Sequence, residues 1–294
     1  MIKLALTDMD DTLVAAGNPG ASAHAIEAIH AVQAAGLHFG PVSGRQPCAM
    51  SWMFDGHAEC CSTGAFSNGQ VVFVDGEAVA AHPLGNDALM HLAEYLEEET
   101  DDTVVKVYDL GADYMGDGAF FLTHDTARVD RVMGSDGNAW LAHEEAPARW
   151  GLDDVPYLKA NIWSARSREE LIELRRRIAV EVPELDLVFP NNRVRLFDLL
   201  PTGWSKGRAV EELARILGLG IDEVAVFGDS DNDLPMIEAV PNSVAVSNAN
   251  EAVASAARWH IGAAADDAVA DALLDIAAAA KAGEMPAFMR SAAR

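Results

Sequence analysis

The stretch Ile2-Lys3-Leu4-Ala5-Leu6-Thr7-Asp8-Met9-Asp10-Asp11-Thr12 decides the fold, because an apolar run ends in it abruptly at a group of acids. Residues 2–7 have the pattern of a short buried strand. Asp8 and Asp10 follow directly, and their carboxylates repel each other if they converge, unless a cation or a shared proton relieves them. A hard ion such as Mg²⁺ takes carboxylate, carbonyl and water oxygens, so the run could form a magnesium site. A solvated acidic loop with Asp11 or Thr12 as a helix cap is the favoured explanation of the run taken alone.

Strand-like and helix-like segments alternate around this stretch, and the alternation resumes at Lys206. Such alternation indicates βαβ units on a parallel sheet. The expected strands are 2–7, 37–42, 57–63, 223–227 and 243–246, with a hairpin over 70–79 around Asp75-Gly76; the expected helices are 18–35, one that begins near 206, 234–239 and 266–282.

The pattern changes between residues 83 and 200, which we interpret as an inserted domain. The expected helices there are 87–99 and 168–182, and the expected strands are 103–109, 119–123, 157–164, 185–190 and 193–200. Apolar and polar residues alternate in Arg193-Val194-Arg195-Leu196-Phe197-Asp198-Leu199, which predicts a sheet with one exposed face. The predicted domains are therefore 1–82 with 201–294, and 83–200.

Composition excludes several classes of protein. The formal net charge of the 294 residues is −25, whereas binding to nucleic acid or to an anionic membrane requires clusters of Lys and Arg. No apolar stretch is long enough to span a bilayer, so we predict a soluble, cytoplasmic protein. Cys48, Cys60 and Cys61 form no CxxC pair and the nine histidines show no HxH or HExxH spacing, so a His/Cys zinc site is not predicted.

Further polar signals follow the other predicted strands of the parallel sheet, at the edge where ligands bind in open α/β sheets. Ser43-Gly44-Arg45 comes after the second strand, and Ser43 can donate its hydroxyl to a phosphate oxygen, although a capped turn explains it too. Lys206, at the start of the helix after the insert, can balance acids and hold a phosphoryl oxygen, although most such lysines are solvated.

The run Gly228-Asp229-Ser230-Asp231-Asn232-Asp233 follows another predicted buried strand. Asp229 suits a metal ligand, and Asp233 is spaced to orient a metal-bound water or Lys206. An EF-hand loop has glycine at its sixth position and glutamate at its twelfth, and this run has neither, which argues against an EF-hand Ca²⁺ site. A solvated turn remains the simpler explanation of the run taken alone.

Together these motifs resemble the haloacid dehalogenase superfamily, in the order in which that superfamily carries them. Asp8-Met9-Asp10-Asp11-Thr12-Leu13 matches the first motif, Ser43 the second, Lys206 the third and Gly228–Asp233 the fourth. The stretch from Ser205 to Gly207 and the later Met236 are similar to the Cof-type sugar-phosphatase branch, with a type II cap of subclass B inserted between the second and third motifs. Ser62-Thr63-Gly64-Ala65 departs from the Asn-Gly-Ala of that branch, which leaves substrate preference open.

The resemblance implies an α/β fold, with a doubly wound, parallel-sheet, Rossmann-like core and an inserted α+β cap. It implies a phosphatase of small phosphorylated metabolites such as sugar phosphates, in which Asp8 is the nucleophile and forms an aspartyl-phosphate, and Asp10 is the general acid and base. Mg²⁺ would be held by the Asp8 carboxylate, the Asp10 carbonyl and Asp229. The remaining implied roles are phosphate binding by Ser43, Gly44 and Lys206, and support of the site by Asn232 and Asp233.

Two alternatives stay open at this point. A phosphotransferase or phosphomutase of the same fold would replace water with a second substrate, and a non-enzymatic phosphoacceptor module also uses clustered Asp with a Lys. The large insert and the spacing of Asp8 and Asp10 count against the module. The sequence leaves the oligomeric state open between monomer and homodimer.

Overall fold

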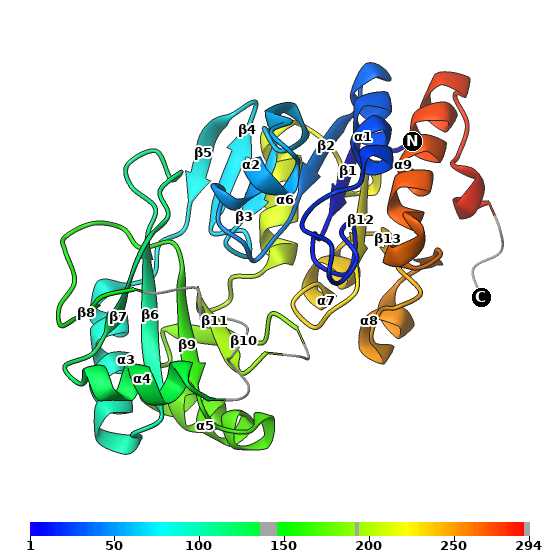
Figure 1. Cartoon of the computed structure of the whole chain (residues 1–294). Helices are drawn as coiled ribbons and strands as arrows, with labels where there is room; N and C mark the ends of the chain where they lie inside the picture. The colour runs from blue at the N-terminus through cyan, green and yellow to red at the C-terminus, as the bar shows by residue number, and fades with distance from the viewer. Residues whose placement is uncertain (136–145, 192–193, 291–294) are drawn as a thin grey trace. The chain divides into compact units, whose positions relative to one another are not determined.

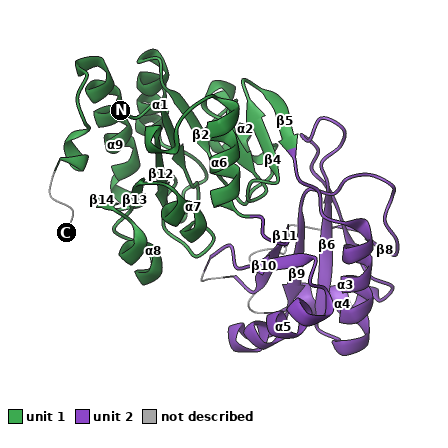
Figure 2. Cartoon of the chain, turned by 180° about the vertical axis from the view of Figure 1, so that it is seen from behind, with its two compact units in different colours: residues 1–80, 205–294 green, residues 81–204 purple. Residues whose placement is uncertain are grey.

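The computed structural model describes residues 1–135, 146–191 and 194–290 (Figure 1). Arg193, the predicted start of a strand, lies outside the described residues, and so does Trp140. The chain divides into two compact units: unit 1 comprises 1–80 and 205–294, and unit 2 comprises 81–204 (Figure 2). No helix among the described residues is long and apolar enough to cross a membrane.

Unit 1 is built on a parallel five-stranded sheet in the order β14-β13-β12-β1-β2, which confirms the predicted parallel core. The chain places β2 on one side of β1 and β12, β13 and β14 on the other, so the strand order reverses beside β1, where ligands bind in such sheets. All residues of β1 are buried, which explains its apolar composition. The bounds are β1 Leu4–Thr7, β2 His38–Pro41, β12 Val224–Gly228, β13 Asn242–Ala245 and β14 Trp259–His260.

Helices flank this sheet, and α1 and α9, from opposite ends of the sequence, pack against each other (Figure 1). The helix predicted over 18–35 begins only at Ala23, because the Ser22 hydroxyl accepts a hydrogen bond from the Ala25 N–H and caps it. Gly36, at φ +77°, follows its end. The helices are α1 Ala23–Ala34, α2 Ala49–Met53, α6 Lys206–Ile216, α7 Leu234–Ala239, α8 Glu251–Ala256 and α9 Ala268–Ala282.

The strand predicted over 57–63 is wrong. The chain forms a short 3₁₀ helix, η1, at Ala58–Cys60, and strand β3 follows at Gly64–Phe66. The strand starts there because only glycine permits the close approach to β2: a Cβ on Gly64 would lie 2.6 Å from the Pro41 carbonyl oxygen. The predicted hairpin is present as β4 Val71–Val74 and β5 Glu77–Ala81, which join β3 in a three-stranded sheet.

Unit 2 contains a six-stranded sheet in the order β10-β11-β9-β6-β7-β8. Its pairs are antiparallel except β7 with β8. The strands are β6 Thr103–Asp109, β7 Gly118–Leu122, β8 Ala148–Arg149, β9 Ala160–Ser164, β10 Leu185–Val188 and β11 Leu196–Pro201, and the helices are α3 Asn86–Glu99, α4 Thr126–Met133 and α5 Arg168–Glu181. Residues of α3 and α5 form one hydrophobic core with strand residues such as Val105, Ile162 and Phe197.

The prediction that this sheet has one exposed face is wrong for β11. Leu196 packs with Trp163 of β9 and Val132 of α4 in a second, smaller core, so the other face of the sheet is covered as well. Asp198 is also buried, and its carboxylate accepts hydrogen bonds from Asn161 and from Lys159, the latter at 3.0 Å. A polar residue in an alternating pattern is therefore no proof of exposure when an ion pair compensates its burial.

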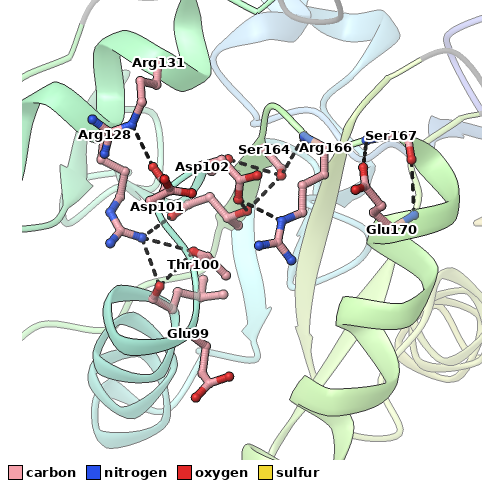
Figure 3. A network of polar contacts seen from close by, with 12 residues as sticks. Glu99, Thr100, Asp101, Asp102, Arg128, Arg131, Ser164, Arg166, Ser167 and Glu170 are labelled. Carbon is pink, nitrogen blue, oxygen red and sulfur yellow. Dashed lines mark hydrogen bonds and ion pairs between the residues drawn. The ribbon is translucent and has the colours of Figure 1, made fainter.

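An arginine of α4 caps the end of α3 (Figure 3). The buried guanidinium of Arg128 donates hydrogen bonds to the carbonyl oxygens of Leu96 at 2.9 Å, Glu97 at 3.2 Å and Thr103 at 3.0 Å, and to the Thr100 hydroxyl at 3.1 Å. The Leu96 carbonyl also accepts hydrogen bonds from the Thr100 N–H at 3.0 Å and the Thr100 hydroxyl at 2.8 Å. The guanidinium adds donors at this helix end, where carbonyls lack partners within the helix, and it places positive charge at the negative end of the helix dipole.

Candidate active site

Asp8 is positioned by the central pair of strands. It follows β1 directly, and its N–H donates to the Phe227 carbonyl oxygen at 2.9 Å, which extends the pairing of β1 with β12 by one residue. The chain then turns sharply at Asp11, which has φ +62°, and the Val14 N–H donates back to the Met9 carbonyl oxygen at 2.8 Å. Asp8 is buried, so its carboxylate has little access to bulk water.

Lys206 brings positive charge to Asp8 from 198 residues further along the chain. It is the first residue of α6, and the Ser205 hydroxyl caps that helix. Its ammonium Nζ donates to Asp8 Oδ1 at 2.5 Å and to Asp233 Oδ1 at 2.6 Å, and its side chain has no exposed surface. Charge-assisted hydrogen bonds of this length are the strong ones, so the lysine is held in one position between two carboxylates.

Asp233 organises the loop that follows β12. Its Oδ2 accepts hydrogen bonds from the N–H groups of Asp229 and Ser230, both at 3.0 Å. Gly228 makes room for it, since a Cβ there would lie 2.7 Å from the Asp233 Cβ. Both oxygens of Asp233 are thus engaged, one by the lysine and one by the loop, and Asp233 fixes the position of Asp229 relative to Lys206.

Asp229 is held on both sides by hydroxyl groups. Thr12, from the loop that follows Asp8, donates to its Oδ1 at 2.9 Å, and Ser230 donates to its Oδ2 at 2.7 Å. The hydrogen bond from Thr12 joins the two acidic loops of the sequence at their strand ends.

Three carboxylates and one ammonium therefore share a nearly buried volume. Among the described residues, oxygens of Asp8, Asp229 and Asp233 lie within 4.8 Å of one another. Burial raises the pKa of Asp8 well above its usual range, and the charge of Asp233 adds to this. Burial likewise raises the pKa of Asp229 to about 7, again with a contribution from Asp233. Since one lysine does not neutralise three carboxylates, the site suits a hard cation bound by oxygen ligands.

Asp10 is paired with an arginine that the sequence did not assign. Arg45 Nε donates to Asp10 Oδ2 and Arg45 Nη2 to Asp10 Oδ1, both at 2.7 Å, in a bidentate pair with about half of the Asp10 side chain exposed. The guanidinium also lies 5.3 Å from the centre of the Trp52 ring. Arg45 thus holds the Asp10 carboxylate by both of its oxygens.

Ser43 and Gly44 lie beside the end of β1. The Val42 N–H donates to the Thr7 carbonyl oxygen at 2.8 Å, so Ser43 follows this pairing as Asp8 does on the neighbouring strand. Ser43 is buried, and its Oγ accepts a hydrogen bond from the Arg45 N–H at 3.1 Å, across Gly44. This turn is thereby fixed at the same edge of the sheet as the aspartates.

Asn68 belongs to this neighbourhood and was missed from the sequence. Its N–H donates to the Ser43 carbonyl oxygen at 2.8 Å, and its Oδ1 accepts from Asn232 Nδ2 at 3.3 Å. Asn68 is buried and has φ +55°, next to Gly69. An Asn-Gly pair after a strand is a turn signal, and it was available in the sequence. The side-chain amide of Asn248 also reaches the first acidic loop and donates to the Asp11 carbonyl oxygen at 2.7 Å.

Comparison with known proteins identifies the family and the fold. A family model described as haloacid dehalogenase-like hydrolase matches residues 5–273. A phosphoglycolate phosphatase of Methanoculleus marisnigri is 51% identical over 57 residues, 19% of this chain and 24% of that protein. The putative phosphatase YxeH of Bacillus subtilis is 25% identical over 263 residues, 88% of this chain and 92% of that protein. The chain thus spans only about a quarter of the first of these relatives.

A solved structure supports the fold. The structure titled as the haloacid dehalogenase subclass IIB sugar phosphatase BT4131 superposes with a TM-score of 0.72 at 19% identity, over 92% of this chain and 97% of that one. At this identity the likeness concerns the architecture, which agrees with the parallel core and the inserted α+β unit.

Proposed function

Because the chain belongs to the haloacid dehalogenase-like hydrolase family, we propose that it is a Mg²⁺-dependent phosphatase of small phosphorylated metabolites that works through an aspartyl-phosphate on Asp8. The observation that carries the proposal is the buried ion-pair chain from Asp8 through Lys206 to Asp233, with Asp229 beside it. The buried Lys206 ammonium supplies local positive charge, which supports binding of a phosphate dianion although the protein as a whole is strongly acidic.

Asp8 attacks phosphorus in line and displaces the alcohol, so that one difficult displacement becomes two easier ones. Lys206, already fixed by two hydrogen bonds, holds a phosphoryl oxygen together with Ser43 and Gly44 while charge is redistributed. The carboxylates of Asp8 and Asp229 and the Asp10 carbonyl would hold Mg²⁺, which would supply positive charge against the repulsion between the nucleophile and the phosphate. Asp233 keeps Lys206 and Asp229 in place.

Asp10 moves the proton. It protonates the leaving oxygen in the first step and takes a proton from the attacking water in the second. Arg45 binds both oxygens of this carboxylate in the structure, so the pair has to open before Asp10 can carry the proton.

Unit 2 is proposed to act as the cap that selects the substrate, with sugar phosphates as the expected class and 83–200 as its predicted extent. The insertion of this α+β unit between Ser43 and Lys206 supports the assignment. The net charge of −25 supports a protein that binds neither nucleic acid nor anionic membranes. A cytoplasmic location and a monomeric or homodimeric state are part of the same proposal.

The proposal is tested by release of inorganic phosphate from a panel of sugar phosphates. We expect turnover with Mg²⁺, and loss of turnover with EDTA or in Asp8→Asn. Asp55→Asn is the matched control, because Asp55 is an exposed acid of unit 1 whose φ of +51° suits Asn. Activity that survives both EDTA and Asp8→Asn would refute the proposal.

A second variant, Asp10→Asn, tests the proton-transfer step. We expect a fall in kcat of about 10²- to 10⁴-fold, with substrate binding retained. Weakened binding at unchanged kcat would contradict this role. An added alcohol acceptor in the same assay separates hydrolysis from phosphoryl transfer, because a phosphotransferase yields a new phosphate ester in place of free phosphate.

A further inference from the structure

Two histidines, a glutamate and a cysteine meet between α1 and η1, remote in the sequence from the acidic motifs. His30 Nε2 lies 2.9 Å from Glu59 Oε1, and His57 Nδ1 lies 3.0 Å from the same oxygen. Cys60 Sγ lies 3.8 Å from His30 Nε2. We call these four residues the His/Cys cluster.

The backbone of η1 is tied to α1 at this point. Gln33, one turn after His30 on α1, donates from its side-chain amide to the Glu59 carbonyl oxygen at 2.6 Å. The Cys60 N–H donates to the His57 carbonyl oxygen at 3.0 Å, which closes the 3₁₀ turn. Donor groups from one helix and one short turn are therefore held together by independent hydrogen bonds.

The cluster combines ionised and buried groups. Hydrogen bonds from its own backbone N–H, from His57 and from His30 lower the pKa of Glu59 to about 2. Cys60 has no exposed surface, and burial together with the charge of Glu59 raises the pKa of its thiol to about 12. A cation at this place would lower the cost of the thiolate, and the thiol proton would pass to solvent when the metal binds.

We propose that His30 Nε2, the Glu59 carboxylate and Cys60 Sγ bind one divalent transition-metal ion, of which Zn²⁺ is the reference case. Among the described residues, ligand atoms of these three lie within 4.8 Å of one another. Imidazole, carboxylate and thiolate are the ligands that Zn²⁺ takes, whereas Mg²⁺ prefers oxygen alone, so this site is chemically distinct from the aspartate site.

Two edges of the triangle can be compared with a tetrahedral ion. With Zn–N of about 2.0 Å and Zn–S of about 2.3 Å, the edges of the tetrahedron are about 3.5 Å for N···S and about 3.3 Å for N···O. The observed N···S separation of 3.8 Å is slightly longer and the observed N···O separation of 2.9 Å slightly shorter than these values, so small side-chain shifts would admit the ion. Water takes the fourth position, and His57 holds the Glu59 carboxylate from outside, as hydrogen-bonded neighbours of metal ligands do.

The test is a titration of the metal-free protein with Co²⁺, whose absorption spectrum shows whether a cysteine sulfur is bound to the metal. A Cys–Co²⁺ bond gives thiolate-to-metal absorption in the near ultraviolet, which the oxygen ligands of the aspartate site cannot produce. We expect this absorption in the wild type and its removal by Zn²⁺. Cys60→Ala should abolish it, whereas Cys61→Ala, which changes the adjacent thiol, should retain it.

His57→Gln serves as the second variant, because about 42% of the His57 side chain is exposed and its replacement leaves the core intact. We expect it to keep the absorption but to bind Co²⁺ about 10- to 100-fold more weakly. Absence of the absorption in the wild type, or its persistence in folded Cys60→Ala, would overturn the proposal. So would Co²⁺ affinity in His57→Gln equal to that of the wild type.

Discussion

The variant Lys206→Met tests the reasoning about the ion-pair chain most directly. Burial alone lowers the pKa of Lys206, but the charges of Asp233 and Asp8 outweigh burial and raise it above the usual value of 10.5. The stabilisation from the charged lysine is therefore fully present below pH 10.5 and is lost only as the pH rises through the raised value. At neutral pH the variant removes all of it.

The magnitude follows from burial. The ammonium has no exposed surface and makes two short charge-assisted hydrogen bonds, and removal of one partner from a buried ion pair costs about 3–5 kcal/mol. Met fills a similar volume, so a cavity contributes little. We expect the free energy of unfolding of unit 1 to fall by about that amount, and kcat to fall about 10²- to 10³-fold, as for loss of one charge-stabilising donor.

Lys3→Met is the matched control. Lys3 pairs with Glu223 at 2.7 Å in the same unit, but 53% of its side chain is exposed, so we expect a loss of at most about 1 kcal/mol. Native-state hydrogen exchange at the β1 and β12 amides, in EDTA, measures both variants. A difference between the two variants of less than about 1 kcal/mol would refute the claim that burial makes the Lys206 pairs strong.

Two further predictions concern pH and the capping arginine. Burial raises the pKa of Asp229 from the ordinary value of 3.8 to about 7, so between these two pH values the metal-free folded state binds a proton that the unfolded state does not, and its stability falls as the pH rises. The affinity for Mg²⁺, measured by calorimetry, should therefore increase as the pH rises through about 7. An affinity that does not change with pH would contradict the raised pKa. Arg128→Met should destabilise unit 2 by about 1–3 kcal/mol, because it leaves the carbonyl oxygen of the buried Thr103 without its donor. Arg176→Met, which removes an exposed pair with Glu173, should cost less than about 0.5 kcal/mol. Hydrogen exchange at the α3 amides distinguishes the two variants.

Strand-end positions were predictable from the sequence because they depend on local apolar runs. Asp8 and Asp229 each follow a run of buried residues, and Lys206 opens a helix after a capping serine. The structure brings these three residues together, as the order of the strands in a parallel sheet requires. Local pattern and global topology agree at these positions.

Pairings between distant loops were not predictable in the same way. The contact of Arg45 with Asp10 and that of Asn68 with Asn232 depend on turns whose backbone angles the sequence indicates only weakly. The mistaken strand at 57–63 has the same origin, because the hydrogen bonds of η1 and the close approach at Gly64 decide where β3 begins. The buried Asp198 shows that burial of a charge depends on a partner, which an alternating pattern does not reveal.

The division of unit 1 into two sequence segments has a consequence for biosynthesis. When the first 80 residues leave the ribosome, β1 has β2 on one edge, but β12, its partner on the other edge, has not been made, and α1 still lacks α9. Unit 2 is continuous and can complete its own sheet first. The nascent chain therefore carries an unpaired apolar strand edge through the synthesis of a whole second unit. It gains Lys206 and Asp229, the partners of its first acidic loop, only after unit 2 has been made.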